Sequence, residues 1–126
     1  MISRTVGFEP NADVFIDEEH GTAMVTVEIA GADPESLRVE MNDEHHLVIS
    51  GRRPRSGHSG AGSLVQKEIA FGDFAKRIYL PVAVECESAG ATYGDGVLVI
   101  TLGLSQAAYH PTARTEIRMI IRRTQV

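Results

Sequence analysis

Alternation of apolar and polar side chains along short runs is the feature that most restricts the fold of this chain. Within residues 24–29, Val25, Val27 and Ile29 alternate with polar Thr26 and Glu28, and residues 37–41 repeat the pattern with charged residues between the apolar ones. A period of two is typical of a half-buried β-strand, because successive side chains of a strand point to opposite faces. These runs therefore predict strands rather than helices.

Further runs extend the prediction to most of the chain. Residues 47–49 and 97–102 are apolar on both faces, as is typical of the central strand of a sheet. Shorter strand candidates are residues 12–16, 64–69, 76–80 and 89–93. Turn-forming residues separate the runs, and Asp95 followed by Gly96 indicates a tight hairpin. With at most one helical turn at residues 33–36, the pattern predicts an all-β fold, an antiparallel β-sandwich.

Size and composition restrict the possible partners. The chain of 126 residues is about as long as one domain, and its net charge of −5 argues against nucleic-acid binding, which needs a cationic surface. No run approaches the roughly 20 apolar residues that cross a bilayer, and the first residues lack the pattern of a signal peptide. We therefore expect a cytoplasmic protein with no membrane partner.

Two segments do not fit a compact sandwich. Residues 52–63 are rich in glycine, serine and arginine and predict a mobile excursion. Residues 103–126 carry four arginines against one glutamate and end in an apolar alternation of Ile117, Met119 and Ile121. Such a tail could dock on the acidic remainder of the chain or on a neighbouring copy, or it could stay solvated.

The usual signatures of enzymes are absent from the sequence. There is no phosphate-binding loop, no dinucleotide fingerprint and no nucleophile elbow. His45 and His46 are adjacent and would point to opposite faces of a strand, so we interpret them as solvated imidazoles beside a turn. Cys86 has no partner histidine that the sequence can identify. We expect no enzymatic activity, no metal and no cofactor.

Four motifs follow one another in a characteristic order. Residues 91–98 have the pattern A-x-x-x-x-G-V-L, beginning at Ala91 and ending at Leu98. The other three motifs are residues 27–37, 47–53 and 71–81. Together they resemble the alpha-crystallin domain of the small heat-shock proteins, over roughly residues 10–102.

This resemblance implies an architecture and an activity. The fold would be an immunoglobulin-like antiparallel β-sandwich over residues 10–102, with a short N-terminal arm at residues 1–9 and a flexible C-terminal tail at residues 103–126. The implied function is that of an ATP-independent holdase, which binds partly unfolded client proteins and prevents their aggregation. The protein would work as a homodimer that builds a higher oligomer.

The resemblance also implies how two subunits pair. In the non-animal branch of the family, a strand carried on the long loop pairs with the first strand of the partner. The loop here is residues 53–69, and the pairing is strand addition to an exposed sheet edge. A local hairpin inside one subunit is the alternative. The implied dimer-interface residues are Ala12, Val14, Ile16, Leu64, Val65, Lys67 and Ile69.

A second implied site is an edge groove that receives an I-x-I motif of the tail. The nearest forms here contain methionine, which can fill an irregular apolar slot, so Ile117, Met119 and Ile121 are the expected anchors. The expected walls of the tail-binding or client groove are Leu37, Val39, Met41, Ala89, Ala91 and Tyr93.

The arm and an alternative function complete the expectations. Relatives carry a long apolar N-terminal arm, whereas the apolar residues here are Ile2, Val6 and Phe8, which we expect to contact clients. The short arm predicts weaker or narrower chaperone action. The alternative is a non-enzymatic docking module like the p23-like co-chaperones, which bind a specific folded partner.

Overall fold

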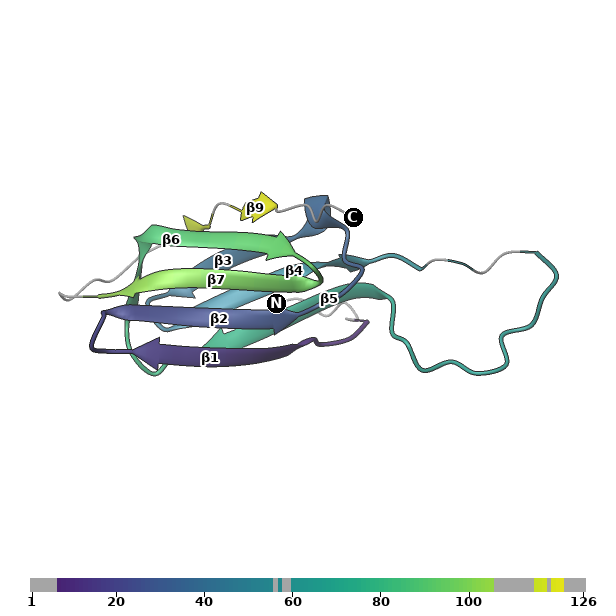
Figure 1. Ribbon diagram of the computed structural model, residues 1–126, viewed down its shortest axis with the longest axis horizontal. Coiled ribbons are helices and arrows are strands. Elements are labelled where there is room, and N and C mark those ends of the chain that lie inside the picture. Colours follow the sequence, from purple (N-terminus) through teal and green to yellow (C-terminus); the bar gives the residue numbers. More distant parts are fainter. Residues whose placement is uncertain (1–6, 56, 58–59, 106–114, 118, 122–126) are drawn as a thin grey trace.

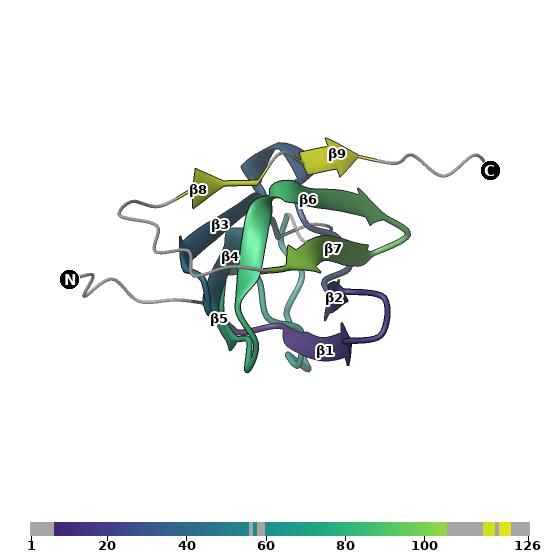
Figure 2. The same ribbon diagram turned by 90° about the vertical axis from the view of Figure 1, so that its left-hand side faces the viewer.

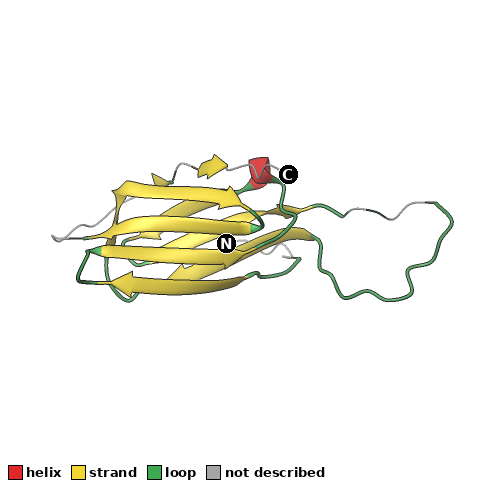
Figure 3. Cartoon of the chain, viewed as in Figure 1, coloured by secondary structure: helices red, strands yellow, loops and turns green. Residues whose placement is uncertain are grey.

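Nine β-strands and one short 3-10 turn make up the regular structure of the described residues in the computed structural model (Figures 1 and 3). The structure describes residues 7–55, 57, 60–105, 115–117 and 119–121. The strands are β1 (Asn11–Asp17), β2 (Thr22–Glu28), β3 (Arg38–Asp43), β4 (His46–Arg53), β5 (Gly72–Tyr79), β6 (Val84–Gly94), β7 (Val97–Leu104), β8 (Thr115–Glu116) and β9 (Met119–Ile121), and the turn η1 is Pro34–Ser36.

The strands form two sheets that face each other, as Figure 2 shows. One sheet has the order β1-β2-β7-β6-β9 and the other the order β5-β4-β3-β8. Neighbouring strands are antiparallel, except that β9 lies parallel to β6. The predicted antiparallel β-sandwich is therefore confirmed.

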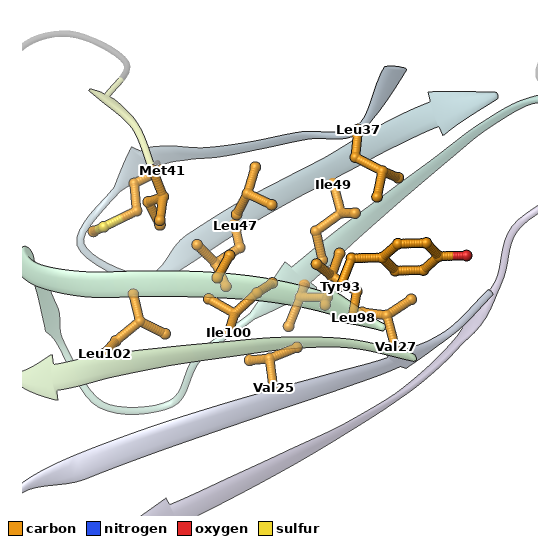
Figure 4. Close-up of a cluster of buried hydrophobic side chains, with 14 of the residues drawn as sticks. Val25, Val27, Leu37, Met41, Leu47, Ile49, Tyr93, Leu98, Ile100 and Leu102 are labelled. Atoms are coloured by element: carbon orange, nitrogen blue, oxygen red, sulfur yellow. The ribbon is translucent and has the colours of Figure 1, made fainter. Parts of the chain in front are cut away.

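The core is built from the alternating apolar residues of the central strands (Figure 4). Val25 and Val27 of β2 are fully buried, and so are Leu98 and Ile100 of β7 on the next strand. Burying each such side chain stabilises the fold by roughly 1.5–3 kcal/mol. The two runs that are apolar on both faces became β4 and β7, and both lie inside their sheets rather than at an edge.

Local turn chemistry fixes two of the connections. Asp95 and Gly96 adopt φ angles of 54° and 77°, which is the left-handed backbone that the β6–β7 hairpin requires. The turn η1 begins after Asp33, whose side-chain Oδ1 accepts a hydrogen bond of 3.2 Å from the backbone N–H of Glu35. Both turns lie where the sequence predicted them.

The strand predicted over residues 64–69 does not form within the chain. Residues 61–71 belong to no strand, and the described parts of the segment between β4 and β5 extend away from the sandwich (Figure 1). A strand needs a neighbour for its backbone N–H and C=O groups, and neither sheet of the chain lies beside this segment. The local hairpin is absent for the same reason.

Close packing at Gly51 of β4 gives a first prediction. A Cβ atom at this position would lie 2.7 Å from Cζ of Phe74 and 2.9 Å from Cδ2 of Leu37, both in the core. We expect Gly51→Ala to lower the free energy of unfolding by about 1–3 kcal/mol, because the core must shift to accept the methyl group. Urea denaturation measures the change.

The matched control is Gly62→Ala. A Cβ atom at Gly62 meets nothing within 4 Å, so the same substitution should leave the urea midpoint unchanged. Equal midpoints for the two variants would contradict the packing argument.

Candidate functional site

The strands β3 and β6 run along the same side of the sandwich, one in each sheet (Figure 2). Five of the six expected groove walls are buried in the groove between them or in the core behind it, and Ala89 is half-buried. The buried walls are Leu37, Val39, Met41, Ala91 and Tyr93.

Residues 115–117 and 119–121 of the same chain lie in this groove. The strand β8 pairs antiparallel with β3, with Glu116 opposite Glu40, and β9 pairs parallel with β6, with Met119 opposite Ala91. Between the two short strands, the backbone N–H of Ile117 donates a 2.8 Å hydrogen bond to the carbonyl oxygen of Val39. The tail thus bridges the edges of both sheets.

The three expected anchors of the tail contribute unequally. Ile117 is 4% exposed and belongs to the hydrophobic core, whereas Met119 is half-buried against that core and Ile121 is 39% exposed. Ile117 is therefore the main anchor, and Ile121 lies at the rim. An ion pair of 3.8 Å joins Glu116 to Arg38, but both side chains are exposed, so it contributes at most about 1 kcal/mol.

Tyr93 has a second task that the sequence did not reveal. Its hydroxyl donates a 2.7 Å hydrogen bond to the carbonyl oxygen of Ile29 and accepts one of 3.3 Å from the backbone N–H of Ala32. The side chain therefore fixes β6 to the connection between β2 and β3. Only long-range contacts create this role, and no local pattern around Tyr93 could have indicated it.

The residues expected at the dimer interface lie apart within one chain. Leu64, Val65 and Ile69 are 51%, 92% and 60% exposed on the loop between β4 and β5. The strand β1 pairs with β2 on one side, and no described strand pairs with its other edge. Apolar side chains are exposed on β1 too, with Val14 40% and Phe15 64% exposed.

Other interface residues differ in burial. Ala12 and Ile16 are half-buried and pack against the core, whereas Lys67 is exposed and its Nζ donates a 3.0 Å hydrogen bond to the carbonyl oxygen of Ile69. Loop and edge present apolar surface, and no described strand pairs with the loop or with the outer edge of β1, which is the combination that strand addition uses.

Among the expected arm residues, Ile2 and Val6 lie outside the described part of the chain. Phe8 is half-buried, and its ring centroid lies 5.5 Å from that of Phe74 in the core. A backbone hydrogen bond of 2.7 Å from the N–H of Gly7 to the carbonyl oxygen of Asp73 holds this segment along β5. Phe8 is therefore a packed, half-buried residue in this structure, and its contact with clients stays a prediction.

The two histidines form separate hydrogen bonds, and both rings contact the ring of Tyr79. Nδ1 of His45 lies 2.7 Å from the carbonyl oxygen of Leu80, and Nδ1 of His46 lies 3.0 Å from Oδ1 of Asp43. The hydrogen bonds that Asp43 receives, first from the backbone N–H of His45 and then from His46, lower the pKa of that carboxyl. The expectation of two solvated imidazoles is thus replaced by two half-buried rings with partners.

Asp17 is the second carboxyl with a shifted pKa. A hydrogen bond of 2.8 Å from the ring of His20, together with the backbone N–H of the same residue, lowers the pKa of Asp17 at the end of β1. Within the described ranges, no group of three or more histidine, cysteine or acidic residues is arranged to hold a metal ion. No helix in the described part of the chain is long and apolar enough to span a membrane.

Comparison with known proteins agrees with this geometry. The model of the Hsp20/alpha crystallin family matches residues 15–119. A 19.0 kDa class II heat shock protein of Oryza sativa subsp. japonica is 33% identical over 87 residues, which cover 65% of this chain and 50% of that protein. The chain spans about half the length of the first curated relatives it matches.

Solved structures show the same fold. Heat shock protein 16.0 from Schizosaccharomyces pombe matches with a TM-score of 0.66 and 28% identity, covering 81% of this chain and 94% of that one. A small heat-shock protein from Xylella fastidiosa, described as having a distinct high order structure, matches with a TM-score of 0.65 and 25% identity, covering 96% and 98%. The chain belongs to the Hsp20/alpha crystallin family, the small heat-shock proteins.

Proposed function

We propose that this protein is an ATP-independent holdase that binds partly unfolded proteins and prevents their aggregation. The observation that carries the proposal is the edge groove, whose apolar walls are covered by a tail segment with one deeply buried anchor, Ile117. Membership of a chaperone family supports the same role. No observation favours the alternative of a p23-like docking module.

The groove has the features needed to receive an extended client segment. Departure of the tail would uncover Val39, Met41 and Ala91 together with the backbone edges of β3 and β6. An unfolded chain could then add as a strand, with its main chain providing affinity and its apolar side chains filling the place of Ile117. One buried isoleucine is worth only about 1.5–3 kcal/mol, so such binding would be reversible.

We further propose that subunits pair through the loop between β4 and β5. The segment from Leu64 to Ile69 of one subunit would add to the free edge of β1 of another, and the exposure of Val65 and Phe15 supports this. Tails that dock on neighbouring copies would extend the dimer to a higher oligomer. On this proposal, residues 1–9, 10–102 and 103–126 are arm, sandwich and tail.

The holdase proposal is tested with a client that aggregates on heating. Light scattering of the client without ATP should fall as this protein is added, with near-complete suppression close to a stoichiometric ratio. No suppression by protein that circular dichroism shows to be folded would refute the holdase, and a monomer that also fails to protect would favour the docking module.

Release of the tail gives another prediction. Ile117→Ser should weaken tail docking by about 1.5–3 kcal/mol, because the buried side chain is lost from the groove. Amide hydrogen exchange of residues 119–121 should accelerate, and suppression of client aggregation should begin at a lower temperature.

Ile121→Ser is the matched control, since Ile121 is 39% exposed and lies at the rim of the groove. It should change the amide hydrogen exchange of the tail and the suppression of client aggregation far less than Ile117→Ser does. If releasing the tail left client protection unchanged, the groove would not be the client site.

Subunit pairing is tested with Leu64→Asp combined with Val65→Asp. Adjacent residues of a strand point to opposite faces, so one of the two carboxylates must face the partner and lose its solvent. We expect the dissociation constant of the dimer to rise at least tenfold, roughly 1.4 kcal/mol, as measured by light scattering across a dilution series.

The control places the same charges just outside the segment, as Gly62→Asp with Ser63→Asp. It should leave the dissociation constant within about threefold of the original value. Equal weakening by both double variants would indicate a charge effect and contradict strand addition.

A further inference from the structure

Arg53 is the last residue of β4, and its guanidinium contacts segments that are far apart in the sequence. Nε and Nη2 donate hydrogen bonds of 2.9 and 2.6 Å to the carbonyl oxygen of Ala70. Nη1 donates a bond of 3.2 Å to the carbonyl oxygen of Ala30, in the connection between β2 and β3. The carbon of the guanidinium also lies 4.4 Å from the centroid of the Phe8 ring.

These contacts tie together both ends of the loop that carries the proposed pairing segment. The loop leaves β4 directly after Arg53 and returns to β5 directly after Ala70 and Phe71. Arg53 also pairs with Gly72 across the sheet, and the ring centroid of Phe71 lies 6.0 Å from its guanidinium carbon. One side chain therefore fixes where the loop begins and where it ends.

The same side chain holds the base of the N-terminal arm. Phe8 contacts both the guanidinium and the ring of Phe74, which is 2% exposed. A cation over an aromatic ring is attracted by the ring's negative face, and the attraction grows where water is excluded. Moving Phe8 away would expose the guanidinium to water. Water molecules would then compete with the two carbonyl oxygens for its N–H groups, and these hydrogen bonds would weaken.

Arginine is suited to this position for chemical reasons. Its planar fork has five N–H donors in a fixed geometry and stays charged at every physiological pH, so it can bind two carbonyls and a ring at once. A lysine at this position would keep the charge, but its single ammonium could not reach all three groups in the same geometry.

We propose that Arg53 is a shared anchor that couples the base of the arm to the pairing loop, so that displacement of Phe8 loosens the Ala70 end of the loop and weakens subunit pairing. The pairing part of this inference rests on the function proposed above. Arg53 acts through the loop and is a positioning residue. A client or partner chain that takes Phe8 from its site would thereby favour dissociation of the dimer.

A double-mutant cycle tests the coupling. Phe8→Leu keeps apolar packing on Phe74 but removes the aromatic face, and Arg53→Lys keeps the charge but removes the fork. Each should raise the dissociation constant of the dimer about tenfold, and the double variant should raise it by clearly less than the product, because both changes break one unit. Additive effects, or no effect of Phe8→Leu, would overturn the proposal.

Arg52→Lys is the matched control. The side chain of Arg52 is exposed, and its hydrogen bonds to Ser36 and Asp33 are made by its backbone. This variant should pair like the original protein. A tenfold rise in the dissociation constant of the dimer for Arg52→Lys would show that any substitution in this basic run weakens pairing. That result would overturn the specific role of Arg53.

A second readout does not depend on pairing. The Nε–H of Arg53 is hydrogen-bonded, so its proton should exchange with water about tenfold more slowly than that of Arg52 in NMR spectra, and Phe8→Leu should remove most of the difference. If the original protein never pairs but Phe8→Leu has this effect, the pairing proposal fails and the anchor is supported. An Arg53 proton that does not respond to Phe8→Leu overturns the anchor.

Discussion

Each sheet of an open sandwich ends in strands whose outer backbone groups lack partners, and this constraint organises the whole structure. The two sheets have four such borders before the termini are considered: β1 and β6 in one sheet, β5 and β3 in the other. The tail covers β3 and β6 with two short strands, and the segment at Gly7 and Phe8 covers the start of β5. No described strand pairs with the outer edge of β1, and the outer edge of β5 has no described strand beside it beyond the contacts at its start.

The tail binds β3 and β6 through few contacts, so its attachment is weak. Two paired residues join β8 to β3, three join β9 to β6, and Ile117 supplies the one deeply buried side chain. The fully buried side chains of β2, β7 and β4 come from strands that pair without the tail, and Ile117 adds to the core at its border. A surface that is apolar, edge-like and covered by a removable segment can be exposed without unfolding the protein that carries it.

Local patterns in the sequence were enough to predict the architecture. The period of two places Val25 and Val27 inside, and the left-handed backbone at Asp95 and Gly96 follows from hairpin chemistry. The prediction of a strand at residues 64–69 was wrong for the single chain. β-Propensity describes the segment itself and does not show whether another strand of the same chain lies close enough to pair with it. The contacts of Tyr93 and Arg53 join residues 17 to 64 positions apart, and such contacts leave no local signature.

The groove residues were predictable for a different reason than the strands. Their apolar character follows from periodicity, and the family resemblance indicated that they lie at a sheet border. The unequal burial of the three tail anchors became visible only in the structure. Ile117 and Ile121 look alike in sequence, yet one is 4% and the other 39% exposed, because the first lies at the crossing between the two sheets and the second beyond it.

On the proposed function, occupancy of the groove is a competition between the chain's own tail and any other extended segment. A tethered tail acts at an effective concentration that short flexible linkers place in the millimolar range, so a client present at micromolar concentration must bind more tightly to displace it. Unfolded proteins can do so by engaging several exposed surfaces at once, whereas a folded protein offers no extended segment. If the groove binds clients as proposed above, the tail raises the threshold for capture, and the small energy of the Ile117 contact keeps that threshold within reach of a partly unfolded chain.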